Sequence, residues 1–187
     1  MKQFIEFNGK VCLVTGAGSD NGIGFWTAKL LGELGGKVII VSTTDRIIKR
    51  QAELTNMGID AKGMVADLMD RTAVRNLISY IIKQHGKIDV LVNNAGMVQT
   101  GVREEEFDHF EDISYESWDR DISRNLDIPF NVTKEVLPYM KKNRYGRIVN
   151  TSSVTGPLVS NPGEASYSAA KAAIIGMSKA IAIETGA

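Results

Sequence analysis

A tyrosine and a lysine lie four positions apart near the carboxyl end of the sequence. In the stretch YSAAK they are Tyr167 and Lys171, and this spacing places both side chains on one face of a helix. The pKa of a phenol is about 10, too high for good proton donation at neutral pH, whereas a neighbouring ammonium favours the phenolate. The pair therefore predicts a tyrosine tuned to protonate a developing alkoxide, although an isolated tyrosine and lysine on a helix surface are usually inert.

A serine upstream could serve the same reaction. Ser153 belongs to NTSSV, which ends a short run rich in valine and isoleucine. Its hydroxyl could hydrogen-bond a substrate carbonyl alongside the tyrosine.

A glycine-rich loop, LVTGAGSDNGIGFW at residues 13–26, lies near the amino end between an apolar run and a helix-like segment. Gly16 would permit a tight turn, Gly22 would let the backbone approach a pyrophosphate, and Gly24 would let the helix pack close to the strand. The helix would add unpaired amides and the positive end of its dipole. Glycine turns between strands and helices are common, so the loop by itself leaves open whether it binds a nucleotide or only turns the chain.

The elements that must position these residues alternate along the chain. Short apolar runs predict five strands, at 10–16, 37–42, 60–67, 87–96 and 146–153. Amphipathic patterns predict helices at 22–34, 45–57, 70–85, 114–125, 127–143 and 165–185. This alternation indicates an α/β fold with a doubly wound parallel sheet, helices on both faces, and ligands at the carboxyl ends of the strands. We see no linker and expect a single domain.

Composition narrows the classes of partner. The 187 residues include 22 basic and 22 acidic side chains, so no net charge favours nucleic acid or an anionic membrane, and small molecules are the better expectation. No run reaches the roughly 18 apolar residues of a membrane span, and the start lacks the apolar core of a signal peptide. The single cysteine, Cys12, suits a reducing compartment. We expect a soluble, cytoplasmic protein.

Taken in order, TGAGSDNGIG, NNAG, SRNL, SS and YSAAK resemble the motifs of the short-chain dehydrogenase/reductase family, and the resemblance covers the whole chain. It implies that Tyr167 is the catalytic acid and base, and that Lys171 binds the nicotinamide ribose and lowers the pKa of that tyrosine. It implies further that Ser153 orients the carbonyl and that Asn125 supports a water-linked proton relay. An asparagine at this place can also serve only as a kink or cap residue.

The same resemblance implies a set of cofactor-binding residues. The turn NNAG would lie against the adenosine half of the cofactor, and Asp67 would bind the adenine amino group, unless it only caps the following helix. The expected set is Gly16, Gly22, Ile23, Gly24, Thr43, Arg46, Asp67, Leu68, Asn94, Ala95 and Gly96, together with Tyr167 and Lys171.

The end of the second strand, VSTTDR at residues 41–46, predicts the choice of cofactor. An acidic residue directly after the strand would pair with the ribose diol of NAD, but hydroxyl residues including Thr43 come first, and Arg46 is close enough to meet a 2′-phosphate. The pattern favours NADP. Asp45 keeps NAD open as an alternative, because it could contact a ribose instead of capping the next helix.

Two departures from the family pattern qualify the resemblance. Five residues separate Gly16 from Gly22, where the commonest pattern has three, and this spacing resembles the enoyl reductase branch. That branch separates its tyrosine and lysine by six residues, however, and YSAAK has three, which favours carbonyl reduction. We also expect residues 1–187 to be a dinucleotide-binding domain that lacks the last strands and the substrate lid of the family fold.

The preferred function is therefore an NADP-dependent carbonyl reductase. The first expectation for its substrate is a 3-oxoacyl thioester, as in fatty acid biosynthesis. Arg144 in MKKNRYGR resembles an arginine that docks acyl carrier protein in 3-oxoacyl reductases of this family, although the cations of this stretch could also serve only as partners of a helix dipole. The next candidates are secondary alcohols, sugars and steroids, in a dehydrogenase that uses NAD. The competing hypothesis is a protein that binds a nucleotide without catalysis or that senses redox state.

We expect no metal and more than one copy of the chain. The acidic stretch REEEFDHFED, residues 103–112, indicates a solvated loop rather than a metal site. The family commonly dimerises through the helices expected at 127–143 and 165–185, and small residues on the second of these would allow close two-fold approach. We expect a homodimer or homotetramer with Ala173 or Met177 near the symmetry axis.

Overall fold

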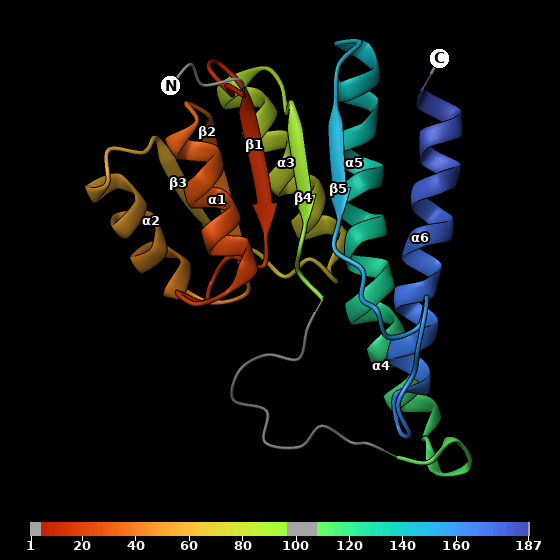
Figure 1. Cartoon of the computed structure of the whole chain (residues 1–187). Coiled ribbons are helices and arrows are strands. Elements are labelled where there is room, and N and C mark those ends of the chain that lie inside the picture. Colours follow the sequence, from red (N-terminus) through yellow and green to blue (C-terminus); the bar gives the residue numbers. More distant parts are fainter. Residues whose placement is uncertain (1–4, 97–107, 187) are drawn as a thin grey trace. The chain divides into compact units, whose positions relative to one another are not determined.

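A computed structural model describes residues 5–96 and 108–186. The chain forms two compact units (Figure 1). Unit 1 consists of Met1–Ala95 and Asn131–Val149, and unit 2 of Gly96–Phe130 and Asn150–Ala187. The candidate catalytic residues all belong to unit 2, whereas every expected cofactor-binding residue before Gly96 belongs to unit 1.

The sheet has five strands in the order β3-β2-β1-β4-β5. They are β1 (Val11–Thr15), β2 (Lys37–Ser42), β3 (Ala61–Val65), β4 (Val90–Asn93) and β5 (Arg147–Asn150). The pairings of β1 with β2, β1 with β4, and β2 with β3 are parallel, so the predicted parallel sheet is confirmed. The strand order reverses between β1 and β4, and in open sheets the carboxyl ends at such a point are where ligands bind.

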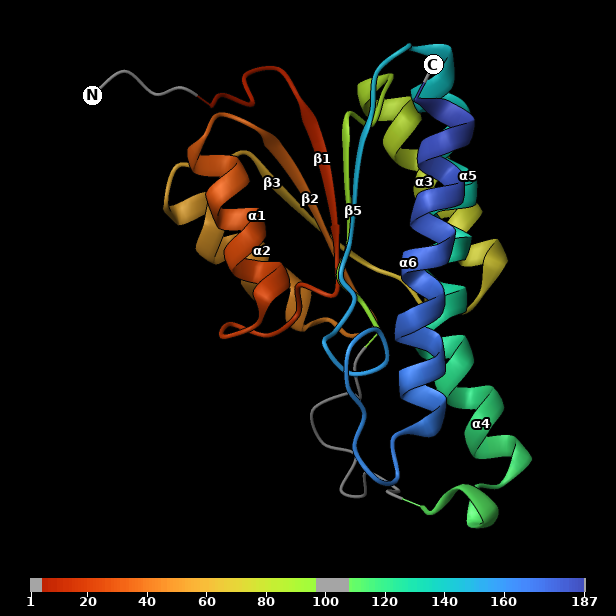
Figure 2. The same cartoon turned by 45° about the vertical axis from the view of Figure 1, so that its right-hand side comes forward.

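Helices lie on both faces of this sheet. Figure 2 shows α1 (Ile23–Glu33) and α2 (Arg46–Asn56) on one face, and α3 (Arg71–His85) and α5 (Ile128–Lys142) on the other. Crossovers between parallel strands require this arrangement, because each connection must return over a face of the sheet. The α/β doubly wound fold expected from the alternating pattern is therefore confirmed.

Unit 2 contains the remaining described helices. They are the short 3-10 helix η1 (Phe110–Asp112), α4 (Tyr115–Ile122), the π-helical segment η2 (Ser123–Asp127) and α6 (Ala165–Thr185). The Ser114 side chain caps α4 by accepting a hydrogen bond from the Ser117 amide, as expected for a serine before a helix. Helix α4 leads through η2 directly into α5, so the polypeptide turns around Asn125 without leaving the helical conformation.

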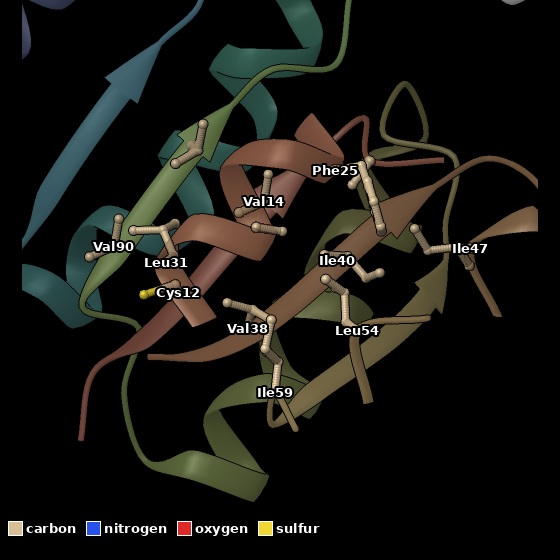
Figure 3. Close-up of a cluster of buried hydrophobic side chains, with 13 residues drawn as sticks. Cys12, Val14, Phe25, Leu31, Val38, Ile40, Ile47, Leu54, Ile59 and Val90 are labelled. Carbon is tan, nitrogen blue, oxygen red and sulfur yellow. The ribbon is translucent and has the colours of Figure 1, made fainter. Parts of the chain in front are cut away.

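Apolar side chains fix the position of β1 and β2 beneath α1 and α2. Alternate residues of the strands, such as Val14 and Ile40, point toward these helices, where they pack with Phe25 and Leu31 (Figure 3). The other members of the cluster are Cys12, Ala17, Ala28, Val38, Ile47, Leu54, Ile59, Val90 and Val92. Burial raises the pKa of the Cys12 thiol to about 12, so this cysteine is a core residue, as its apolar surroundings predict.

The amino ends of the central strands are held by a buried carboxylate. Oδ2 of Asp89 accepts a hydrogen bond from the Val11 amide at 2.8 Å, and the same oxygen lies 2.9 Å from Nζ of Lys87. Asp89 is only 6% exposed, and its pairing avoids the cost of an isolated buried charge. This end of the sheet is therefore structural, and the opposite, carboxyl ends of the strands carry the candidate site.

None of the helices in the described residues has the combination of length and hydropathy that a membrane span requires.

Candidate active site

The glycine loop after β1 has the tight geometry that its sequence predicts. Gly16 has a φ of +70°, and a Cβ there would stand 2.8 Å from the backbone of Ala95. At Gly24 a Cβ would stand 2.6 Å from the Gly16 carbonyl oxygen. Both positions therefore require glycine, one for the turn and the close approach of β4, the other for the close packing of α1.

The amino end of α1 suits an anionic group. The helix begins at Ile23, its N-cap is Gly22, and no side chain within the described chain caps it. Its first turn also contains no acidic residue. The first amides of a helix lack partners within the helix, and its dipole favours negative charge. A loop of bare backbone that leads into such a helix end fits the pyrophosphate of a dinucleotide.

Thr15 joins the ends of β1 and β4. Its hydroxyl accepts hydrogen bonds from the amides of Asn94, at 3.0 Å, and Ala95, at 3.1 Å, and donates to the Val92 carbonyl at 3.3 Å. The Asn94 side chain donates in turn to the carbonyls of Thr15 and Gly16. The sequence analysis missed Thr15, although a threonine that ends an apolar run directly before the glycine loop is a signal that could have revealed it.

Polar residues also follow β2. Ser42 donates from its hydroxyl to the Thr44 carbonyl at 2.8 Å, and Nε of Arg46 donates to the Thr44 hydroxyl at 3.2 Å. Thr43 and Arg46 are exposed. Asp45 occupies the N-cap position of α2, as one of its two alternatives expects, but its side chain makes no capping hydrogen bond.

The residues after β3 form a turn of their own. Oδ1 of Asp67 accepts a hydrogen bond from the Met69 amide at 2.9 Å, whereas Asp70 caps α3 by accepting one from the Thr72 amide. The alternative in which Asp67 caps the helix is therefore wrong. Leu68 is 3% exposed, and its carbonyl accepts a hydrogen bond from the Asn131 side chain, which fixes the backbone of this turn.

An ion pair ties the long glycine loop to α2. The guanidinium of Arg50 lies 3.1 Å from Oδ2 of Asp20, and its hydrogen bond lowers the pKa of Asp20. Arg50 is 4% exposed and lies over the ring of Phe25, 5.5 Å from its centroid. The extra residues between Gly16 and Gly22 thus include one that holds the loop to a neighbouring helix.

In unit 2, helix α6 brings Tyr167 and Lys171 together. Nζ of Lys171 lies 5.5 Å from the centroid of the Tyr167 ring and donates a hydrogen bond to the Thr151 carbonyl at 3.3 Å. Lys171 is 3% exposed, and burial lowers the pKa of its ammonium. Tyr167 is half-buried, so its side chain keeps access to solvent.

The segment after β5 is fastened to the same helix. The Ser152 hydroxyl donates to the Lys171 carbonyl at 2.7 Å, and the next residue, Ser153, accepts a hydrogen bond from the Thr155 amide through its own hydroxyl oxygen at 3.1 Å. Ser153 therefore retains its hydroxyl proton for donation to another acceptor. The position of this serine is fixed on both sides, by Ser152 and by Thr155.

Asn125 lies in η2 with one half of its amide unpaired. Its Nδ2 donates to the Asp121 carbonyl at 3.1 Å, whereas its buried Oδ1 has no partner within the described residues. Gly96 has a φ of +136°, and a Cβ there would stand 3.5 Å from this Oδ1. A buried acceptor without a partner has a cost, which a water molecule or a ligand group could remove.

The part of the chain that the structure describes shows no grouping suited to a metal. Among the described residues, no three histidine, cysteine, aspartate or glutamate side chains are close enough to hold an ion. The acidic stretch at 103–112 lies partly outside the described residues.

The sequence is similar to those of known oxidoreductases. A family model described as short chain dehydrogenase matches residues 10–187. The chain is 39% identical over 179 residues to the oxidoreductase UcpA of Salmonella typhimurium, and the match covers 96% of this chain and 65% of that protein. It is 40% identical over 186 residues to the 3-oxoacyl-acyl-carrier-protein reductase FabG of Thermotoga maritima, with 96% and 70% covered. The chain thus spans about two thirds of the length of these curated relatives.

Solved structures agree with the fold. NAD+-bound xylitol dehydrogenase superposes with a TM-score of 0.88 at 34% identity, over 97% of this chain and 67% of that one. A metagenomic short-chain oxidoreductase in complex with NADP superposes with a TM-score of 0.85 at 30% identity, over 95% and 77%.

Proposed function

Because the chain belongs to the short-chain dehydrogenase family, we propose that it is an oxidoreductase that transfers a hydride between NADP(H) and a carbonyl compound or the corresponding secondary alcohol. Tyr167, Lys171, Ser153 and Asn125 carry the proton chemistry. The loops that follow the strands of unit 1 bind the nucleotide.

The burial of Lys171 is the observation that supports this function most strongly. Its ammonium is almost fully removed from solvent, and within the described residues no carboxylate pairs with it. An ammonium that is buried without a counter-charge destabilises a fold. Such groups are found where chemistry needs them, and here the ammonium lies one helical turn from a half-buried tyrosine.

Each side chain has a distinct task in reduction. The bound nicotinamide supplies the hydride to the carbonyl carbon. The Tyr167 hydroxyl donates its proton to the carbonyl oxygen, and the Ser153 hydroxyl donates a hydrogen bond to the same oxygen. The Lys171 ammonium favours the phenolate that remains on Tyr167. Oδ1 of Asn125 accepts a hydrogen bond from a water molecule through which the proton returns to the tyrosine.

For the cofactor we favour NADP. Arg46 is exposed at the end of β2, and its two terminal guanidinium nitrogens have no hydrogen-bond partner among the described residues, so they suit a 2′-phosphate. The neighbour in complex with NADP supports this choice. NAD remains the alternative, because one neighbour is bound to NAD+ and because the Asp45 side chain, which makes no capping hydrogen bond, is available to contact a ribose.

For the substrate we favour a 3-oxoacyl thioester of an acyl carrier protein, reduced in the cytoplasm for fatty acid biosynthesis. The identity to the FabG of Thermotoga maritima supports this assignment. So does a cluster of cations at the end of α5, where Lys141 and Lys142 form the last turn and Arg144 follows with a φ of +52°. An acidic carrier protein would be attracted to these charges.

A direct assay tests the function. The purified chain is mixed with NADPH and a panel of ketones and 3-oxoacyl thioesters, and the loss of NADPH absorbance is followed. Tyr167→Phe should lower kcat by roughly 10²-fold or more while NADPH binding stays nearly intact, because only the proton donor is lost. Tyr139→Phe, a change of the same size in α5, serves as the matched control. Full activity of Tyr167→Phe would refute the assignment, and NADPH binding without turnover of any carbonyl would favour a nucleotide-binding or redox-sensing role.

A further inference from the structure

We propose that Asp121 is a positioning residue that holds Asn125 and the first turn of α6 in one arrangement. The inference rests on the proposed function, because the proposed function assigns roles in proton transfer to Asn125 and to Tyr167, the residue after Ser166. Asp121 lies in the last turn of α4, and all the residues involved belong to unit 2.

Asp121 makes two hydrogen bonds with different parts of its structure. Its backbone carbonyl accepts one from Nδ2 of Asn125 at 3.1 Å. Its carboxylate accepts another from the hydroxyl of Ser166 at 2.5 Å, across a sequence separation of 45 residues. One residue therefore contacts both the π-helical segment η2 and helix α6.

The bond to Asn125 decides which way that amide faces. An asparagine amide has a donor side and an acceptor side. Because Nδ2 is directed at the Asp121 carbonyl, Oδ1 must point the other way, and it is this buried oxygen that has no partner within the described residues. The proposed relay requires an acceptor at this place, so the carbonyl of Asp121 sets the useful orientation.

The bond to Ser166 fixes the residue directly before Tyr167. Ser166 is 5% exposed and lies in the first turn of α6, whose N-cap residue, Glu164, makes no capping hydrogen bond through its side chain. The start of a helix without such a cap frays more readily. A hydrogen bond from a buried hydroxyl to a carboxylate is strong, and here it ties the first turn of α6 to α4.

A double-mutant cycle on turnover tests the proposal. The variants are Asp121→Ala, Ser166→Ala and the double variant, with Asp121→Asn as the conservative change that keeps an acceptor oxygen. Ser168→Ala is the matched control. Ser168 lies in the same turn of α6 as Ser166, but its hydroxyl pairs with that of Ser160 and does not contact Asp121.

We expect either single alanine variant to lower kcat about 10-fold with the KM for NADPH changed less than about twofold, and the double variant to lose no more than the worse single one. Asp121→Asn should recover most of kcat, and Ser168→Ala should match the wild type. Additive losses, wild-type kcat in Asp121→Ala, or a fall in thermal stability with kcat intact would overturn the positioning role.

Hydrogen exchange separates this proposal from the function on which it rests. If the wild-type chain reduces no carbonyl compound, the proposed function fails. The amide of Ser168, which donates to the Glu164 carbonyl at 2.8 Å, can still be followed: its exchange should become faster in Asp121→Ala and Ser166→Ala alike, and stay near the wild-type rate in Asp121→Asn. Unchanged exchange in the alanine variants would refute the contact itself as a constraint on α6.

Discussion

The charge of Lys171 opposes the stability of the fold, and the proposed function requires it. Burial lowers the pKa of its ammonium, which means that the folded state binds this proton less firmly than the unfolded state. Below the lowered pKa both states are charged, and the destabilising contribution is fully present. As the pH rises from there toward the ordinary value of 10.5, the folded state loses the proton first, so this contribution to the free energy of unfolding becomes less unfavourable.

The first prediction concerns this charge. Lys171→Met should raise the free energy of unfolding at neutral pH by roughly 1 kcal/mol while it weakens NADPH binding and slows turnover, because a buried cation is exchanged for an apolar side chain. The stability gain should be smaller at pH 10.5, the ordinary pKa of a lysine, than at neutral pH, because the folded state loses this proton before the unfolded state does. Urea unfolding of both proteins at the two pH values measures this, and a gain that grew with pH would contradict the assigned direction of the shift.

Arg46 gives a second prediction at the same scale. Arg46→Ala should weaken NADP binding by about 1–2 kcal/mol, the scale of a charge-assisted hydrogen bond, and leave NAD binding almost unchanged. Lys49→Ala, which removes a neighbouring exposed cation of α2, controls for the loss of charge alone. Titration with both nucleotides measures the effect, and equal losses for NADP and NAD would mean that Arg46 does not bind the phosphate.

What could be predicted of single residues depended on how far apart in the sequence their partners lie. Tyr167 and Lys171 were predicted to be neighbours because a helix fixes the distance between positions four apart, and their contact is observed. The bond between Asp121 and Ser166 joins segments 45 residues apart, so no local pattern contains it. The catalytic and cofactor-binding roles of the candidate residues stay predictions.

At the scale of elements, the glycine loop gives a third prediction. Asp20 holds this loop to α2 through Arg50, so Asp20→Asn should raise the Kd for NADPH several-fold, since a loosened loop must be ordered again on binding. The midpoint of thermal unfolding should hardly move, because the Asp20 side chain is largely exposed and the buried Arg50 keeps its ion pair with Glu53, so the lost pair contributes little.

The control and the pH dependence make this test specific. Asp119→Asn, in α4, removes the same charge from an exposed residue to which no cofactor contact is assigned. The Asp20 carboxylate has a lowered pKa, so its pairing persists above the ordinary value of 3.8 and is lost only as the pH falls further. The difference between wild type and Asp20→Asn should therefore be constant through neutral pH, and a difference that vanished there would rule out the ion pair as its cause.

The strands and helices themselves were largely predictable. Short apolar runs marked all five strands, and the predicted helix boundaries differ from the observed ones by only a few residues. The π-helical segment η2 was not predicted: separate helices at 114–125 and 127–143 were expected, whereas the structure continues from α4 to α5. The period of apolar residues shows which face of a helix is buried, and helix propensity shows where a helix can form. Neither indicates a local change in the backbone hydrogen-bond pattern.

At the scale of the whole molecule, the outer side of α6 suggests how copies of the chain associate. Ala172, Gly176 and Ala180 are exposed on it, and Ile183 is 83% exposed. Ala173 and Met177, which the sequence analysis placed near a symmetry axis, are half-buried. Small residues on an exposed helix face allow two backbones to approach closely across a two-fold axis, so we predict a dimer at least, with Gly176 as the position at which to test it.

Gly176 is suited to this test because a Cβ added there meets no atom within 4 Å. Gly176→Arg should therefore leave the fold intact and give monomers with reduced activity, since the added side chain occupies the space that a second copy needs. Gly176→Ala, the matched control, should remain a dimer and gain up to about 1 kcal/mol of stability, because glycine is unfavourable inside a helix. Light scattering at micromolar concentration distinguishes the two outcomes. A wild-type chain that is already monomeric there, or an unchanged mass for Gly176→Arg, would show that this face of α6 does not hold the copies together.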